Sequence, residues 1–180
     1  MSSTHIALLR GINVGGKNKV PMKQLVEVFI DAGCSDVRTY IQSGNVVFSV
    51  DSALLESISA RLTKAVAERF GYETPVLLRT AEQLRAVISG NPFLEAGIPE
   101  DELHVLFLSG LPDPTRVDVL DPDRSRPDAF AVRGQEVYLW LPNGVARTRL
   151  TNDYFDSKLA TISTGRNWRT VAKLFELMKE

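Results

Sequence analysis

The chain has 180 residues, of which 44% are hydrophobic and 24% are charged, and its formal net charge is −1. It contains no apolar run near the roughly 18 residues of a membrane span, and no basic region precedes an apolar one as in a signal peptide. The single cysteine, Cys34, excludes an internal disulfide and a cysteine-based metal cluster. We therefore expect a cytoplasmic protein of one large or two small domains, with no membrane partner and with a monomer as the default state.

Charge is distributed unevenly along the chain. Residues 1–50 and 145–180 carry more Lys and Arg than Asp and Glu, whereas residues 51–144 are acidic. One interpretation is that the basic ends pair with the acidic middle when the chain folds. The other is that the two ends meet and form a basic patch that binds an anion. The sequence leaves both interpretations open.

The first half of the chain predicts the element order β-α-β-β-α-β. A short apolar run at 6–9 is typical of a buried central strand, and apolar residues at helical spacing predict a helix over 21–33. A β-hairpin is expected over 37–50, followed by a helix over 51–71 and a strand at 75–78. This order is typical of a ferredoxin-like split βαβ unit with a mainly antiparallel sheet.

The pattern then restarts. Thr80 and Gln83 predict a capping box at the start of a short helix. Beyond it, the stretch 104–110 repeats the stretch 5–11, with the histidine, the last leucine and the glycine identical. The remaining elements predicted are a small helix after Pro114, a hairpin over 129–141, and helices over 151–159 and 167–179.

These elements predict an α+β fold made of two duplicated ferredoxin-like halves. The N-terminal half is expected over 1–90 and the C-terminal half over 103–180. The intervening residues 91–102 contain prolines and acidic residues and are predicted to be the linker. The two halves are expected to pack either as separate domains or as one intimate unit.

Several motifs together resemble one bacterial family over essentially the whole chain. They are LLRGINVGGKNKVPM, VRTYIQSGNVVF, NPF, the strand at His104, YLWLPNG and TGRNWRTVAKL. The chain resembles the family catalogued as domain of unknown function 1697. The resemblance implies a duplicated ferredoxin-like fold, and it carries over no activity and no catalytic residue. The chain departs from the family at 145–150, where a segment containing Arg147 and Arg149 stands in place of a Ser–Lys pair, so a contact there would have to accept Arg, with its different donor geometry, in place of Lys.

The loop after the first strand is the main candidate site. Residues 11–17 match the glycines and the lysine of the P-loop pattern, but Asn18 stands where that pattern needs a hydroxyl to ligate Mg²⁺. We therefore do not predict a nucleotide-hydrolysing enzyme. A weaker hypothesis is that the amides of Gly15 and Gly16, together with two lysines, hold a phosphate or a carboxylate. The alternative is that the glycines only permit a turn and the lysines are solvated.

Other polar residues extend this candidate site. Arg166 and Arg169 are expected near the start of the last helix, where each cation opposes the helix dipole by roughly 0.3–1 kcal/mol. They therefore need an anionic partner, which is either a ligand or a carboxylate of the chain. The full set of candidate ligand-binding residues is Arg10, Asn13, Gly15, Gly16, Lys17, Asn18, Lys19, Arg38, Gln42, Ser43, Asn45, Arg147, Arg149, Arg166, Asn167 and Arg169.

Three classes of function fit these features. The favoured one is a module that binds an anionic small molecule or a nucleotide-like phosphate group through the loop 11–19. The second is a single-stranded nucleic-acid-binding protein, disfavoured by the near-neutral charge. The third is an enzyme of unknown reaction, although the sequence shows no catalytic set and we predict no metal and no cofactor. The stacking candidates for the second class are Tyr40, Phe48, Tyr138 and Trp140.

Overall fold

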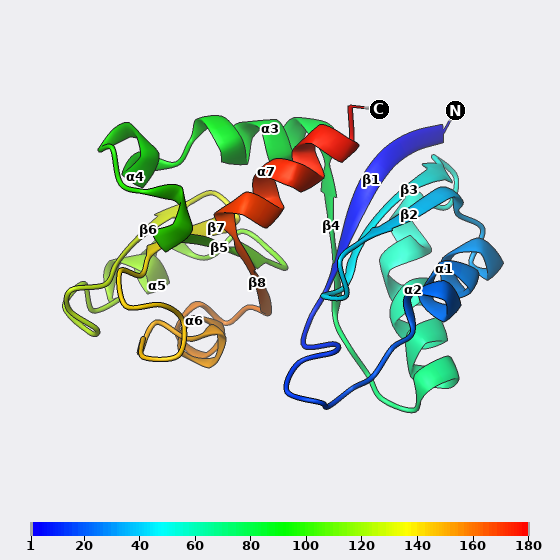
Figure 1. The fold of residues 1–180 in the computed structure, drawn as a ribbon, viewed down its shortest axis with the longest axis horizontal. Helices are drawn as coiled ribbons and strands as arrows, with labels where there is room; N and C mark the ends of the chain where they lie inside the picture. The colour runs from blue at the N-terminus through cyan, green and yellow to red at the C-terminus, as the bar shows by residue number, and fades with distance from the viewer. Residues whose placement is uncertain (1, 180) are drawn as a thin grey trace. The chain divides into compact units, whose positions relative to one another are not determined.

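The computed structural model describes residues 2–179. The chain divides into two compact units (Figure 1). Unit 1 comprises Met1–Leu84 and Leu174–Glu180, and unit 2 comprises Arg85–Lys173. Within residues 2–179, no helix has the length and apolar character needed to cross a membrane.

Unit 1 is a four-stranded antiparallel sheet with two helices on one face (Figure 1). The strand order is β2-β3-β1-β4, so β1 lies in the interior of the sheet. The elements are β1 (Ser2–Leu9), α1 (Met22–Asp31), β2 (Ser35–Tyr40), β3 (Asn45–Asp51), α2 (Leu55–Phe70) and β4 (Val76–Thr80).

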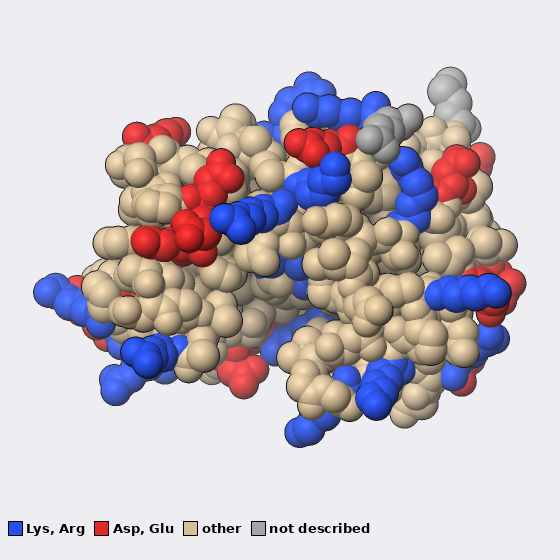
Figure 2. Space-filling model, in the orientation of Figure 1, with Lys and Arg blue, Asp and Glu red and all other residues tan. Residues whose placement is uncertain are grey.

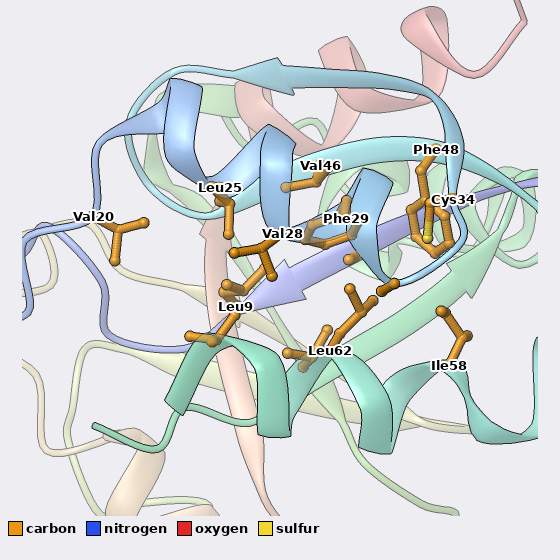
Figure 3. Close-up of a cluster of buried hydrophobic side chains, with 14 of the residues drawn as sticks. Leu9, Val20, Leu25, Val28, Phe29, Cys34, Val46, Phe48, Ile58 and Leu62 are labelled. Carbon is orange, nitrogen blue, oxygen red and sulfur yellow. The ribbon is translucent and has the colours of Figure 1, made fainter. Parts of the chain in front are cut away.

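The core of unit 1 lies between this sheet and the two helices. Leu25 and Phe29 of α1 face Ile58 and Leu62 of α2, and all four side chains are buried (Figure 3). The ring of Phe29 meets the ring of Phe48 edge-on, with centroids 5.3 Å apart. Because apolar residues recur at helical spacing in both helices, each helix has one face that must be buried against the sheet.

Unit 2 repeats the same plan. Its strand order is β6-β7-β5-β8, again fully antiparallel, and its core packs α6 against the sheet. The elements of the second half are α3 (Ala81–Ser89), α4 (Pro92–Glu95), η1 (Glu100–Glu102), β5 (Leu103–Leu108), α5 (Pro114–Asp118), β6 (Ala129–Arg133), β7 (Glu136–Trp140), α6 (Asn152–Leu159), β8 (Ser163–Asn167) and α7 (Trp168–Leu177).

Equivalent backbone hydrogen bonds mark the duplication. The Leu9 amide donates to the Gly44 carbonyl at 2.8 Å, and the Leu108 amide donates to the Gln135 carbonyl at 2.8 Å. The residue that follows each of these leucines donates its amide to the residue just before the last strand of its unit. The Arg10 amide donates to the Pro75 carbonyl, and the Ser109 amide donates to the Ile162 carbonyl. The prediction of an α+β fold with two similar antiparallel halves is confirmed.

One strand was not predicted. The last helix was expected from Asn167 and begins at Trp168, but the preceding residues, Arg166 among them, form the strand β8. The strand lacks alternating apolar residues, and its buried positions are the polar side chains of Ser163, Thr164 and Arg166. A pattern based on hydrophobic alternation therefore cannot detect it. The expected linker also contains regular structure, namely α4 and η1.

Candidate functional site

The loop after β1 folds into a small hairpin. The Lys17 amide donates to the Val14 carbonyl at 3.0 Å, and these two residues form an antiparallel bridge. The central residues, Gly15 and Gly16, have φ values of 58° and 75°. Positive φ at both central positions is what a type I′ turn requires, so both glycines have a structural reason to be there.

The side chain of Asn13 fixes this hairpin to its surroundings. Its Nδ2 donates to the carbonyls of Val20 at 3.0 Å and Gln42 at 2.8 Å, while its Oδ1 accepts from the Val20 amide at 2.8 Å. Asn18 makes a similar contact, since its Nδ2 donates to the Gly11 carbonyl at 3.1 Å. Asn13 and Asn18, both predicted as ligand-binding residues, thus use their amides to hold the loop.

Two residues that the sequence did not indicate also support the loop. The Tyr72 hydroxyl donates to the Asn18 carbonyl at 3.0 Å, and the buried Thr74 hydroxyl donates to the Arg10 carbonyl. Burial raises the pKa of Tyr72 above its ordinary value. Both residues lie in the segment before β4, far from the loop in sequence, and no motif connects the two segments.

The turn between β2 and β3 lies beside the loop. The buried Asn45 donates its Nδ2 to the Tyr40 carbonyl at 3.2 Å and to the Ser43 Oγ at 2.9 Å. Gly44 has a φ of 80°, and a Cβ there would lie 2.9 Å from the Cβ of Leu9. The side chains of Ser43 and Asn45, like the glycine, thus shape a turn that contacts the end of β1.

One residue of this turn has an unusual conformation. Ile41 has a φ of 48°, in the left-handed region that β-branched residues rarely adopt. The conformation costs about 1–2 kcal/mol for an ordinary L-residue. The side chain recovers little of this through packing, because 52% of its surface is exposed.

The loop and the turn together border a pocket of about 340 Å³. Four residues of the predicted ligand-binding set meet there. Among residues 2–179, the exposed Lys17 and Lys19 pair with no carboxylate, and the amides of Gly15 and Gly16 donate to no protein acceptor. The lining residues are Asn13, Gly16, Lys19, Val20, Pro21 and Gln42.

This geometry differs from a phosphate-binding P-loop. In the P-loop pattern the lysine lies at the start of the helix, so that helix amides point at the phosphate. Here Lys17 lies in the hairpin turn, and α1 begins only at Met22. Arg38 lies outside the pocket lining, and its Nη2 donates to the Leu177 carbonyl at 3.1 Å, at the end of α7.

A larger hollow of about 530 Å³ lies between α1 and α2. Its lining carries charges of both signs, from Arg61, Lys64 and Arg69 and from Asp31 and Glu68, and two of the three cations form ion pairs. Arg69 contacts Glu27 with an Nη2–Oε2 distance of 2.9 Å, and Lys64 contacts Glu68 with an Nζ–Oε1 distance of 3.7 Å. Because its lining also includes Asp31, this hollow is a weaker candidate for an anion than the pocket beside the loop.

The remaining candidates belong to unit 2 and line neither pocket. Arg147 and Arg169 are exposed, and the backbone of Arg149 contacts Ser125 and Arg124. Asn167 accepts the Thr170 amide at 2.8 Å and thereby caps α7.

Arg166 is a buried cation on β8. Its Nη1 donates to the Thr164 Oγ1 at 2.9 Å and to the Gly165 carbonyl at 2.8 Å. Burial lowers the pKa of Arg166 to about 10, so the guanidinium keeps its charge at neutral pH. The expectation that a helix dipole leaves Arg166 in need of an anion is wrong, because the residue precedes the helix and lies in a strand.

Two of the four stacking candidates for nucleic acid are also wrong. Phe48 is fully buried in the core of unit 1, and Tyr138 is buried with its hydroxyl donating to the Val87 carbonyl at 3.1 Å. Trp140 is partly buried and donates its Nε1 to the Glu102 carboxylate at 2.7 Å. Among the described residues, no group of three or more His, Cys, Asp and Glu side chains is placed to hold a metal ion.

A model of the family described as Protein of unknown function (DUF1697) matches residues 2–138. The chain is similar to the solved structure of a conserved bacterial protein from Streptococcus pneumoniae, with a TM-score of 0.77 and 21% identity over 100% of both chains. At this identity the likeness shows a shared fold. No curated protein matches the chain.

Proposed function

Since the chain belongs to the family described as Protein of unknown function (DUF1697), we propose its function from the geometry of the loop after β1: this loop binds a small anion. The class includes a phosphate, a phosphate ester and a carboxylate. The observation that carries the proposal is a pocket lined by Lys19 and Gln42, whose described lining contains no carboxylate. The proposal makes unit 1 a binding module and requires no catalytic residue.

The charge around the loop supports this proposal. Glu27 is the first acidic residue of the chain, whereas Arg10, Lys17 and Lys19 all precede it. Over the loop that follows β1, Figure 2 shows Lys and Arg side chains and no Asp or Glu. Among residues 2–179, Lys17 and Lys19 form no ion pair with a carboxylate, so an anion approaching this loop meets two unpaired ammonium groups.

The two glycine amides supply donors with a fixed direction. Lysine ammonium groups attract an anion from any side, but they do not orient it. The type I′ turn holds the N–H groups of Gly15 and Gly16 at adjacent positions, and Gly16 lines the pocket. We expect these amides to donate to the anion, because a charged acceptor strengthens a hydrogen bond from a backbone N–H.

The exposure of the lysines limits the expected affinity. Exposed charge pairs typically contribute about 0.2–1 kcal/mol each. We therefore expect inorganic phosphate to bind with a Kd on the order of 1 mM. Binding should weaken as salt is added, because exposed charges are screened over a Debye length of about 10 Å at 0.1 M ionic strength.

A titration followed by amide NMR tests the proposal. At low ionic strength, inorganic phosphate should shift the Gly15 and Gly16 amide signals to saturation. Lys19→Ala should weaken binding by about threefold or more, whereas Lys23→Ala, a change on the exposed face of α1, should leave it unaltered. If phosphate, acetate and phenyl phosphate all leave these amide signals unmoved, the loop is not an anion site.

A further inference from the structure

Ile41 combines an unfavourable backbone conformation with an exposed aliphatic side chain. Five non-glycine residues of the described chain have positive φ, and the other four are Asn, Asp or Ala. Asn and Asp tolerate this conformation because their short side chains form local hydrogen bonds. Ile41 has no such compensation, and half of its surface faces solvent.

A second exposed aliphatic residue, Val14, adjoins the other segment of the pocket, and like Ile41 it lies next to a lining residue without belonging to the lining. Ile41 directly precedes Gln42, and Val14 directly follows Asn13. Gln42 and Asn13 both line the pocket, and the hydrogen bond of 2.8 Å from the Asn13 Nδ2 to the Gln42 carbonyl joins their two segments. Val14 is 63% exposed.

We propose that the ligand is an organic anion bearing a small aliphatic group, and that Ile41 and Val14 contact that group. The inference rests on the proposed function, because Lys19 and the glycine amides bind the charged end of the same ligand. The exposed Pro21 supplies further apolar surface in the pocket lining. The lysines thus select the charge, and the exposed aliphatic residues select an ester or an acid with an alkyl substituent over the bare inorganic ion.

Inorganic phosphate and monobutyl phosphate are the probes that separate binding of the anion from contact with an aliphatic group. They share a phosphate group, and only the ester carries an alkyl chain. A fully buried methylene strengthens binding by about fourfold. With its butyl group partly buried, monobutyl phosphate should therefore bind about tenfold more tightly than inorganic phosphate. NMR titration or calorimetry of the intact chain gives both dissociation constants.

Ile41→Asn is the informative variant. Asparagine favours the left-handed region, so the turn should keep its shape while it loses the aliphatic contact. The variant should bind phosphate as the parent does and should lose most of the advantage of butyl phosphate. Ala160→Gly is the matched control, because Ala160 has a φ of 51° at the end of α6 in unit 2. The Ala160→Gly variant should still bind monobutyl phosphate about tenfold more tightly than inorganic phosphate.

The outcomes are distinct. Equal affinity for the two probes overturns the inference and leaves the anion site standing. A butyl advantage that survives in Ile41→Asn also overturns it, because the alkyl group then lies elsewhere. Failure of both probes to bind removes the proposed function, and the inference fails with it.

Discussion

Arg79 and Arg166 lie at equivalent positions in the two sheets, opposite Ile6 and Val105. Both are buried, and each donates its Nη1 to the carbonyl of the residue that precedes it, Leu78 at 2.9 Å and Gly165 at 2.8 Å. A contact that recurs in both units is a property of the repeated fold. We therefore interpret Arg166 as a part of the scaffold.

Replacing Arg166 should accordingly affect stability. Arg166→Ala removes the hydrogen bonds to Thr164 and Gly165 and leaves a cavity, so we expect a loss of about 2–4 kcal/mol in the free energy of unfolding. Urea unfolding measures this loss. A change below about 0.5 kcal/mol, typical of a surface substitution, would contradict the scaffold interpretation.

The amide of Asn13 should be the main support of the loop. Asn13→Ala removes three hydrogen bonds to Val20 and Gln42, and we expect unit 1 to lose about 2–3 kcal/mol of stability. Hydrogen exchange should accelerate at residues 14–20. Asn13→Gly is the control for backbone conformation, since it accepts the φ of 54° but lacks the side chain, and it should be destabilised as well.

Relief of the left-handed conformation at Ile41 should stabilise the chain. Ile41→Gly and Ile41→Asn should each raise the free energy of unfolding, by about 1 kcal/mol for asparagine. Chemical denaturation gives the values. If either variant is instead destabilised by about 1 kcal/mol, the packing of the Ile41 side chain contributes more than its left-handed backbone conformation costs.

Stability should fall as the solution is acidified, with His104 as one cause. Burial lowers the pKa of His104 below its ordinary value of 6.5, partly opposed by the backbone of Glu102. Between the lowered pKa and about pH 6.5, the unfolded chain therefore binds more protons at His104 than the folded chain does. The contribution of His104 to the free energy of unfolding is complete above about pH 6.5 and is lost as the pH falls through the lowered pKa. His104→Gln should flatten this part of the profile in unfolding experiments between pH 8 and 5. An unchanged profile would assign the acid sensitivity to other groups.

The thiol of Cys34 should be unreactive in the folded protein. Burial raises the pKa of Cys34 to about 11, although Arg61 partly opposes this shift, and the side chain is in the core beside Phe48 (Figure 3). The reactive thiolate is therefore scarce at neutral pH. A disulfide reagent should modify Cys34 slowly in buffer and rapidly in urea. Complete modification of the native protein within minutes would contradict this prediction.

Local sequence signals predicted most of the fold. The reciprocal bonds of the capping box join Thr80 and Gln83 at 2.9 and 3.1 Å, as their spacing indicated. The motif resemblance to the family is confirmed as well. The strand β8 escaped prediction because its buried side chains are polar, and their burial depends on partners that only the folded sheet supplies.

The candidate site was predictable only in part. The glycines and lysines of the loop follow from its composition, and the structure brings Gly16, Lys19 and Gln42 to one pocket. The roles of Tyr72 and Thr74 depend on contacts between distant segments, which a single sequence does not encode in any local pattern. Similarly, nothing in the residue types around Ile41 indicates its positive φ.

The equivalent corners of the two sheets differ in length. Both begin with the same backbone bond, Leu9 to Gly44 and Leu108 to Gln135, yet the chain reaches its next helix at Pro114 in unit 2 and only at Met22 in unit 1 after a longer excursion. Unit 2 forms its four-stranded sheet with the short corner alone. Since the same strand plan forms in unit 2 without it, the hairpin of unit 1 is an extra segment on the shared plan, and its transfer to the corner after Ser109 would make a chain with two such loops.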